Sequence, residues 1–248
     1  MRRPRRSIVV AAAVALLLPA GARAQTADGF FFQSPRWTIT LRTGVAVPRA
    51  ESDVFAFTSE QLTVDRGDFK ALSLGADLEM RVLAWTRLAL SIDGSHKSRR
   101  SEFREYIDNN DMPIEQSTKF GRVSFSLGVK QYLMRPGRAI GRFAWIPSRF
   151  APFVGGGVGA MRYDFHQVGD FVDFVDMDVF TAQFRSTGWT GTAHGRVGFD
   201  YSLTPRAALT TQGRYDWSNG ATLSRDFSGF GRIDLTGFAG TVGISLRF

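Results

Sequence analysis

The chain has 248 residues, with 31 Lys and Arg against 23 Asp and Glu, a formal net charge of +8, and no cysteine. The lack of cysteine excludes disulfides, thiolate metal sites and haem attachment through thiols. Five of the cationic side chains are arginines within residues 1–24, which contain no acidic residue. Without this segment the balance is 26 against 23, so the charge gives no support to nucleic-acid binding.

Residues 1–24 predict a secretory signal peptide. They combine a cationic start at Arg2–Arg6, an 11-residue apolar run over residues 8–18, and an A-x-A cleavage site at Ala22-Arg23-Ala24. The apolar run is too short to cross a hydrocarbon core of about 30 Å as a helix, although a retained N-terminal anchor is the alternative. We therefore expect a signal peptide over 1–24 and one secreted domain over 25–248.

Runs of about ten residues with alternating apolar and polar side chains follow along the chain. They cover, in order, residues 37–47, 70–82, 86–96, 120–134, 152–165, 188–203, 206–217 and 233–248. No apolar stretch of 18 residues follows the signal peptide, and glycine (26) and phenylalanine (22) are abundant. This pattern is typical of a transmembrane barrel. The predicted fold is all-β, an eight-stranded antiparallel up-and-down transmembrane barrel; ten strands is the alternative if residues 170–184 add a hairpin.

The connections between the runs alternate in length. Four are long, at residues 48–69, 97–119, 166–187 and 218–232, and two are short, at 83–85 and 204–205. Long extracellular loops alternating with short periplasmic turns are expected of a barrel whose termini are both periplasmic. The connection over residues 135–151 is the exception, because it is long but falls on the periplasmic side.

The polar members of each run predict the inner face of the barrel. They carry both signs of charge, and the predicted lumen charges are Arg42, Asp77, Glu79, Arg87, Asp93, Arg122, Lys130, Arg196, Asp200, Arg214 and Asp216. The interior of an eight-stranded barrel is only wide enough for its own side chains. Buried charges also require close partners. We therefore predict a lumen filled by ion pairs.

The facing of residues 152–165 is less clear, because four glycines interrupt the alternation. We expect Met161, Tyr163 and Phe165 to point outward, and Arg162 and Asp164 to point inward. Aromatic rings favour the membrane interface, and they gather near the ends of the runs. The expected girdle is Trp37, Phe69, Trp85, Phe120, Tyr132, Tyr163, Phe165, Trp189, Tyr201, Tyr215, Trp217 and Phe248.

Three stretches carry a family resemblance: the signal peptide, the glycine-rich residues 152–161, and the terminal strand. In the terminal strand Gly243, Leu246 and Phe248 match the C-terminal assembly signal of bacterial outer-membrane proteins. The chain resembles the small outer-membrane β-barrel superfamily of OmpA-like, OmpX-like and OmpW-like barrels. The resemblance implies a Gram-negative outer membrane and closure of the terminal strand against residues 37–47. It also implies contacts with outer-membrane lipids and the assembly machinery, a monomeric barrel, no cofactor and no nucleic acid.

Catalysis in such a barrel would need a histidine beside a nucleophile or a carboxylate. Nothing in the sequence pairs His96, His166 or His194 in this way. The segment Asp216-Trp217-Ser218-Asn219-Gly220 is similar to the His-x-Ser-Asn segment of lipid A deacylase barrels, but Asp216 stands where that family has its histidine. An aspartate has the wrong pKa to activate serine at neutral pH. We predict no catalytic, cofactor-binding or metal-binding residues.

The sequence therefore predicts a non-enzymatic outer-membrane protein that acts in envelope integrity or in surface interaction through its long loops, where an extracellular partner would bind. The first alternative is a narrow porin or OmpW-like channel for small solutes. The second is a lipid A-modifying barrel enzyme.

Overall fold

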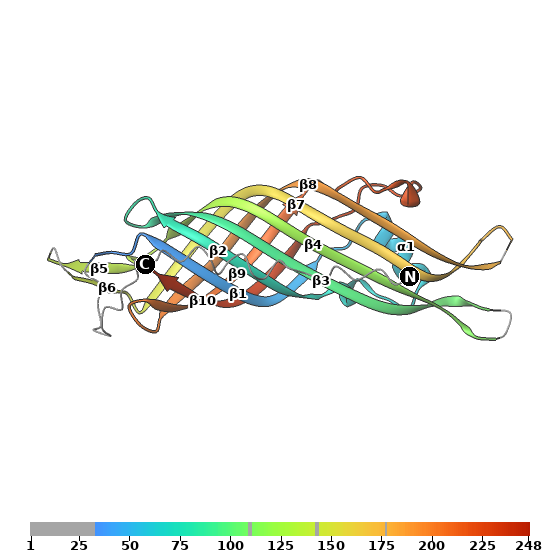
Figure 1. Cartoon of the computed structure of the whole chain (residues 1–248), viewed down its shortest axis with the longest axis horizontal. Helices are drawn as coiled ribbons and strands as arrows, with labels where there is room; N and C mark the ends of the chain where they lie inside the picture. The colour runs from blue at the N-terminus through green and yellow to red at the C-terminus, as the bar shows by residue number, and fades with distance from the viewer. Residues whose placement is uncertain (1–32, 109–110, 142–143, 177) are drawn as a thin grey trace, which may run out of the picture.

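The computed structural model describes residues 33–108, 111–141, 144–176 and 178–248, so the predicted signal peptide lies outside the described residues. Eight antiparallel strands form a closed barrel in the order β1-β10-β9-β8-β7-β4-β3-β2 (Figure 1). The strands are β1 (Trp37–Pro48), β2 (Ala71–Arg81), β3 (Thr86–Ile107), β4 (Pro113–Tyr132), β7 (Phe150–Val172), β8 (Val179–Ser202), β9 (Ala207–Ser218) and β10 (Gly237–Arg247). The eight-stranded prediction is confirmed. The ten-stranded alternative is wrong, because residues 170–184 lengthen β7 and β8 instead of adding strands.

The barrel closes between its first and last strands, as the terminal pattern predicted. The β1–β10 register runs from Thr38 opposite Arg247 to Pro48 opposite Gly237. The backbone N–H of Phe248 donates to the Trp37 carbonyl at 2.9 Å, which extends the pairing to the last residue. Every strand therefore has two hydrogen-bonded neighbours, and the wall has no free edge.

The strands differ in length by a factor of about two. β3, β4, β7 and β8 have 20 to 24 residues, whereas β1, β2, β9 and β10 have 11 or 12. The extra length lies at the end away from the C-terminus, which we call the loop end (Figure 1). There the β3–β4 and β7–β8 hairpins project beyond the barrel wall. The sequence predicted one strand that ends at His96 and one that begins at Phe120, and both predicted strands were too short. Strand pairing continues beyond these residues, although polar side chains replace the outward apolar ones there.

The opposite end, which we call the turn end, holds the short connections after β2 and β8 together with the C-terminus (Figure 1). It also holds a hairpin that the sequence did not predict, β5 (Gly137–Ile140) and β6 (Ala144–Pro147), within the long connection between β4 and β7. No helix in the described part of the chain is long and apolar enough to cross a membrane.

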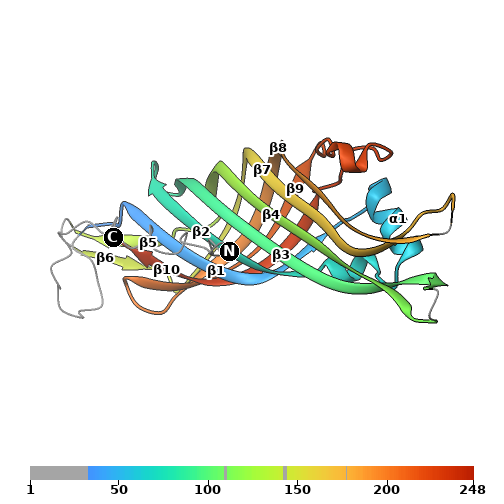
Figure 2. The same ribbon diagram turned by 45° about the vertical axis from the view of Figure 1, so that its right-hand side comes forward.

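The two remaining long connections fold over the mouth of the barrel at the loop end. The β1–β2 connection contains helix α1 (Asp53–Gln61) and the 3₁₀ turn η2 (Arg66–Phe69), and the β9–β10 connection contains η3 (Arg225–Phe227). Leu62 bridges to Phe103 on β3, which ties the end of α1 to a projecting strand. Figure 2 shows α1 beside the base of the projecting hairpins.

Candidate functional site

The structure places the predicted lumen charges inside the barrel, with nine of the eleven buried and Asp93 and Asp216 partly exposed. Near the turn end they form one group around Lys130. Its ammonium lies 3.1 Å from Glu79 Oε1 on β2 and 3.1 Å from Asp200 Oδ2 on β8. The Tyr132 hydroxyl donates to the same Asp200 oxygen at 2.6 Å. We call Glu79, Lys130, Tyr132 and Asp200 the turn-end cluster.

A second group, the mid-lumen cluster, lies further along the lumen. Arg42 donates two hydrogen bonds to Asp77, at 2.8 and 2.9 Å, and lies 3.0 Å from Asp93. Arg214 on β9 then joins Asp93 at 2.5 Å and Asp216 at 2.8 Å. The result is a chain of alternating charges that links β1, β2, β3 and β9. Charge-assisted bonds of this kind offset the cost of removing the ions from water.

Arg196 has no partner comparable to those of Arg42 and Arg214. None of the three guanidinium nitrogens of Arg196 makes a hydrogen bond, and its nearest ion-pair distance is 3.6 Å, from Nη1 to Asp77 Oδ1. Both ring nitrogens of the neighbouring His194 are also without a partner. These side chains lie over the glycines of β7. A Cβ on Gly155 would lie 3.0 Å from Arg196 Nε, and one on Gly157 would lie 2.8 Å from His194 Cε1. The glycine-rich segment therefore makes room for lumen side chains.

The loop-end half of the interior is apolar, which the sequence did not predict. The Phe55 side chain of α1 is fully buried, with ring centroids of Phe69, Phe120 and Phe165 at 5.0, 5.1 and 5.6 Å in edge-to-face arrangements. The cluster, which we call the plug, comprises Ala50, Val54, Phe55, Leu62, Val64, Phe69, Phe103, Ile114, Phe120, Met161, Tyr163, Phe165, Val172, Ala221, Phe227, Ile233 and Leu235. It draws on α1, on both folded connections and on the walls of the long strands. Close packing of this kind leaves few voids that water could occupy.

The plug overturns two predictions about aromatic residues. Met161, Tyr163 and Phe165 point inward and are buried, whereas Arg162 is exposed, so the predicted facing of this segment was wrong. Five predicted girdle residues also lie inside: Phe69, Phe120, Tyr132, Tyr163 and Phe165. Above the membrane-spanning part a barrel can fill its interior with loop side chains, so apolar residues on these strands face inward.

Arg122 marks the boundary between the charged lumen and the plug. Its Nη1 donates to the Leu235 carbonyl at 2.7 Å, and its guanidinium carbon lies 5.8 Å from the Phe120 ring centroid. Described residues missed by the sequence reasoning include Arg247, which is buried near the turn end and donates to Ser202 at 3.0 Å. Its place on the polar side of the terminal alternation was the available signal.

The outer wall is apolar where the lumen is charged. Its large exposed side chains include Leu41, Val45, Leu72, Leu74, Leu78, Leu90, Ile92, Phe125, Leu127, Val129, Val158, Val197, Val242, Ile244 and Leu246. Trp37, Trp85, Trp189, Trp217 and Phe248 of the predicted girdle are exposed on this wall. A closed barrel that is apolar outside and charged inside meets the requirements of a lipid environment. This chain is a closed eight-stranded β-barrel with the apolar outer surface of a membrane-spanning barrel.

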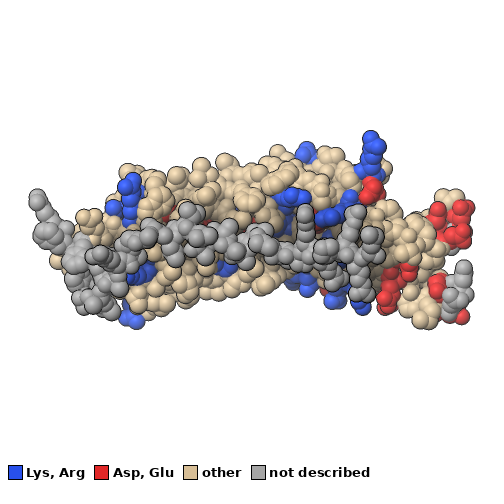
Figure 3. All heavy atoms as spheres, in the orientation of Figure 1, with Lys and Arg blue, Asp and Glu red and all other residues tan. Residues whose placement is uncertain are grey.

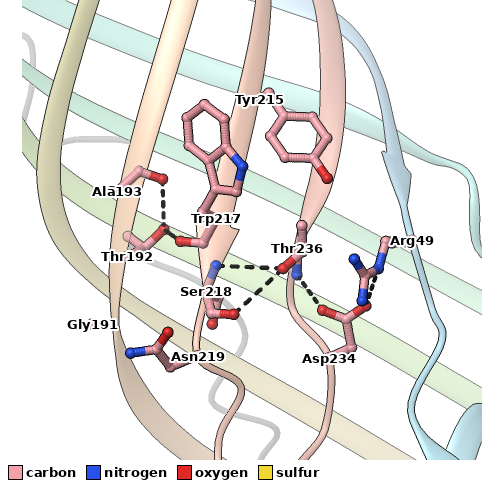
Figure 4. A pocket seen from close by; sticks show the side chains of 10 residues that line it. All are labelled: Arg49, Gly191, Thr192, Ala193, Tyr215, Trp217, Ser218, Asn219, Asp234 and Thr236. Carbon is pink, nitrogen blue, oxygen red and sulfur yellow. Dashed lines mark hydrogen bonds and ion pairs between the residues drawn. The ribbon is translucent and has the colours of Figure 1, made fainter.

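One cavity lies on the outside of the barrel, just above the apolar wall at the loop end. It has a volume of about 590 Å³ and lies beside β8 and β9, between them and the residues just after β1 and just before β10 (Figure 4). Its lining residues are Arg49, Gly191, Thr192, Ala193, Tyr215, Trp217, Ser218, Asn219, Asp234 and Thr236. Arg49 lies 3.1 Å from Asp234 Oδ2, and this carboxylate raises the pKa of the Arg49 guanidinium above its ordinary value.

Ser218, from the segment that is similar to lipid A deacylase barrels, lines this cavity. The Ser218 hydroxyl oxygen accepts a bond from the Gly220 N–H at 3.0 Å, and no histidine is among the lining residues. His194 lies instead in the lumen, directly across the ladder from Asp216. A serine hydrolase needs a base within hydrogen-bond reach of its nucleophile, and the described residues around Ser218 do not supply one.

No protein-family model and no curated protein sequence matches the chain. Among solved structures it is similar to the outer-membrane protein OprG of Pseudomonas aeruginosa, at 13% identity, covering 88% of this chain and 99% of that one, with a TM-score of 0.48. Neisserial surface protein A matches at 13% identity over 90% and 100% of the two chains, with a TM-score of 0.46. The Escherichia coli outer membrane protease OmpT matches at 12% identity over 89% and 99%, with a TM-score of 0.39.

Proposed function

We propose that this barrel is a non-enzymatic, non-conducting scaffold that presents its two projecting hairpins for contacts at the cell surface. The observation that carries the proposal is the plug, because it fills the extracellular half of the interior. The turn-end cluster adds a second obstruction, with Lys130 held between Glu79 and Asp200 across the lumen. A solute would have to displace both a packed aromatic core and a buried ion-pair group.

The hairpin tips support the surface role. Val175 is 87% exposed at the tip of β7–β8, and Phe174 beside it is also exposed. Ile107 and Met112 are exposed at the tip of β3–β4. Acidic side chains gather toward this end of the molecule (Figure 3), and the two hairpins carry Glu102, Glu105, Asp111, Glu115, Asp173, Asp176 and Asp178. Apolar side chains held in water beyond the membrane mark a contact surface, and the acidic surround favours a partner with basic groups.

Planar-bilayer recording on the refolded barrel tests the non-conducting part of the proposal. We expect no reproducible unitary conductance from the wild-type chain. Reproducible steps from wild-type protein would overturn it in favour of the narrow channel. Shortening the tips, by replacing residues 107–112 and 173–178 with short turns, tests the surface role. We expect barrel folding to survive and cell-surface adhesion to fall, whereas unchanged adhesion would contradict the role of the hairpins.

The non-enzymatic part has its own test. Mass spectrometry of lipid A from cells with and without the protein compares the acyl chains directly. Because no histidine is among the residues that line the cavity at Ser218, we expect identical spectra. An acyl-chain difference that disappears with Ser218→Ala would establish the lipid A-modifying alternative.

A further inference from the structure

A small cavity lies at the loop end, between helix α1 and the projecting parts of β3, β4, β7 and β8. It has a volume of about 150 Å³. Six phenylalanines line it: Phe57, Phe103, Phe171, Phe174, Phe180 and Phe184. Figure 2 shows α1 and the projecting hairpins, which form its two sides. We call this cavity the aromatic pocket.

The plug forms the floor of the aromatic pocket. Leu62, Phe103 and Val172 belong both to the plug and to the lining of the pocket. The Phe171 and Phe184 rings form part of the wall above them, with their centroids 4.8 Å apart in an edge-to-face arrangement. An occupant of the pocket would therefore rest on the plug instead of passing through it.

One polar atom in the lining of the pocket lacks a hydrogen-bond partner. Gln116 is 5% exposed, and its side-chain oxygen Oε1 is buried and accepts no hydrogen bond. The amide of Gln167, on the adjacent strand, donates only long bonds to the Thr58 and Thr118 hydroxyls, both at 3.4 Å. A buried acceptor without a donor is costly, so a donor that reaches it gains affinity. The pocket therefore favours an apolar group that carries an O–H or N–H.

The volume of the pocket limits the occupant to one small ring. An apolar cavity of about 150 Å³ accommodates a single benzene ring. The surrounding phenylalanines present both edges and faces, which are the contacts that aromatic rings prefer. A phenol group meets the requirement for size and the requirement for a donor together.

The hairpins beside the pocket are strongly acidic. Residues 167–184 contain four aspartates and no Lys or Arg. Residues 102–115 contain five acidic residues against one arginine. Acidic side chains gather at this end of the molecule in Figure 3. A free neutral phenol gains nothing from this charge, whereas a phenol flanked by cations is attracted to it.

We propose that the aromatic pocket binds one tyrosine side chain of a partner protein, in a segment with lysine or arginine beside that tyrosine. This inference rests on the proposed surface role and names the chemistry of the partner. The tyrosine ring packs between Phe57 of α1 and the phenylalanines of β7 and β8, and its hydroxyl donates to Gln116 Oε1. The flanking cations lie near Asp173 and Asp176. A rigid aromatic anchor in a pocket from which water is excluded commonly carries much of the affinity of an interface.

Fluorescence anisotropy of a labelled peptide tests the proposal on the full-length folded barrel in detergent. The probe is a short glycine–serine peptide with a central lysine–tyrosine–lysine sequence. Companion peptides replace the tyrosine by phenylalanine, or both lysines by glutamate, and free p-cresol represents the tyrosine side chain alone.

Three variants of the barrel complete the design. Gln116→Leu removes the acceptor, and Phe180→Ala removes part of the aromatic wall. Met112→Ala is the matched control, because Met112 is an exposed apolar residue of the other hairpin and does not line the pocket. Heat-modifiable migration establishes that each variant is folded.

We expect the wild type to bind the tyrosine peptide about fivefold to tenfold more tightly than the phenylalanine peptide, which leaves Gln116 Oε1 unpaired. Gln116→Leu should bind these two peptides equally. Phe180→Ala should weaken binding of the tyrosine peptide about fivefold, because a ring contact is lost, whereas Met112→Ala should bind as the wild type does. The glutamate peptide should bind the wild type more weakly than the two lysine peptides.

Equal binding of the tyrosine and phenylalanine peptides by the wild type would overturn the proposal. Binding of p-cresol as tight as that of the tyrosine peptide would also overturn it, because the pocket would then be a site for a small phenolic solute. Either result would leave the surface role intact if shortening the hairpin tips still lowered adhesion. Unchanged adhesion with tyrosine-selective binding would instead contradict the surface role and keep the selectivity of the pocket.

Discussion

The ammonium of Lys130 lies 3.1 Å from Asp200 Oδ2, and this contact joins β4 to β8 across the interior of the barrel. β7 separates the two strands in the wall, so the ion pair is a tie in addition to the hydrogen-bonded ladders. Glu79 on β2 completes the arrangement from the other side. The barrel interior is thus cross-linked by charges at its turn end and by aromatic packing at its loop end.

Lys130→Met removes the cation from between two buried carboxylates. We expect a loss of about 3–5 kcal/mol in the free energy of unfolding, because Glu79 and Asp200 remain buried without their partner. Urea unfolding of the refolded protein in phospholipid bilayers measures this. Lys70→Met, at an exposed lysine before β2, is the matched control and should change the free energy by less than about 0.5 kcal/mol. A small effect of Lys130→Met would mean that water solvates these carboxylates.

Arg42 and Arg196 both approach Asp77, but with different geometry. Arg42 makes two hydrogen bonds to that carboxylate, whereas Arg196 makes none and stands 3.6 Å away. We expect Arg42→Met to cost about 3–5 kcal/mol and Arg196→Met to stay within about 1 kcal/mol of wild type, because the latter removes a buried charge without breaking a bond. Equal losses in the same unfolding assay would show that Arg196 has strong partners in solution.

Phe55 and Phe57 allow the plug to be tested on one helix. Phe55 is fully buried against three rings, whereas Phe57 is 40% exposed. Phe55→Ala should cost about 3–5 kcal/mol of unfolding free energy, because it opens a cavity in packed surroundings. Phe57→Ala should cost clearly less. If the two losses were equal, the plug would not be a packed core. Bilayer recording on Phe55→Ala should still show no unitary conductance, because the turn-end cluster remains.

The membrane-spanning part of the fold could be predicted because lipid outside and charge inside give the strands a strict period of two. This is why the pairing of the terminal strand with β1 was correct. The same rule failed above the membrane. Tyr163 and Phe165 were assigned to the outer face, but α1 and the β9–β10 connection return into the barrel and bury them. Alternation reports which residues share a face, and only the surroundings decide which face is inside.

The sequence also could not predict which lumen charges pair with each other. The contact of Arg214 with Asp93 joins residues 121 positions apart, on strands at opposite sides of the ring. Such a contact depends on the tilt and stagger of all eight strands. The glycines of β7 made the facing of that strand ambiguous in the sequence. Their role is to leave room for the Arg196 and His194 side chains, which only the positions of the lumen side chains show.

Gly243 and Gly240 on β10 give a test of barrel closure. A Cβ on Gly243 would collide with the Leu41 carbonyl oxygen on β1 and would lie 2.8 Å from Arg42 Cγ, whereas a Cβ on Gly240 would meet only Phe238 Cε1, at 3.7 Å. We expect Gly243→Ala to displace the Arg42 side chain from Asp77 and to lower the folded fraction in heat-modifiable gel migration. Gly240→Ala should fold as wild type. If Gly243→Ala folded as well as Gly240→Ala, the β1–β10 pairing would have room for a methyl group. The position of Arg42 would then not depend on this glycine.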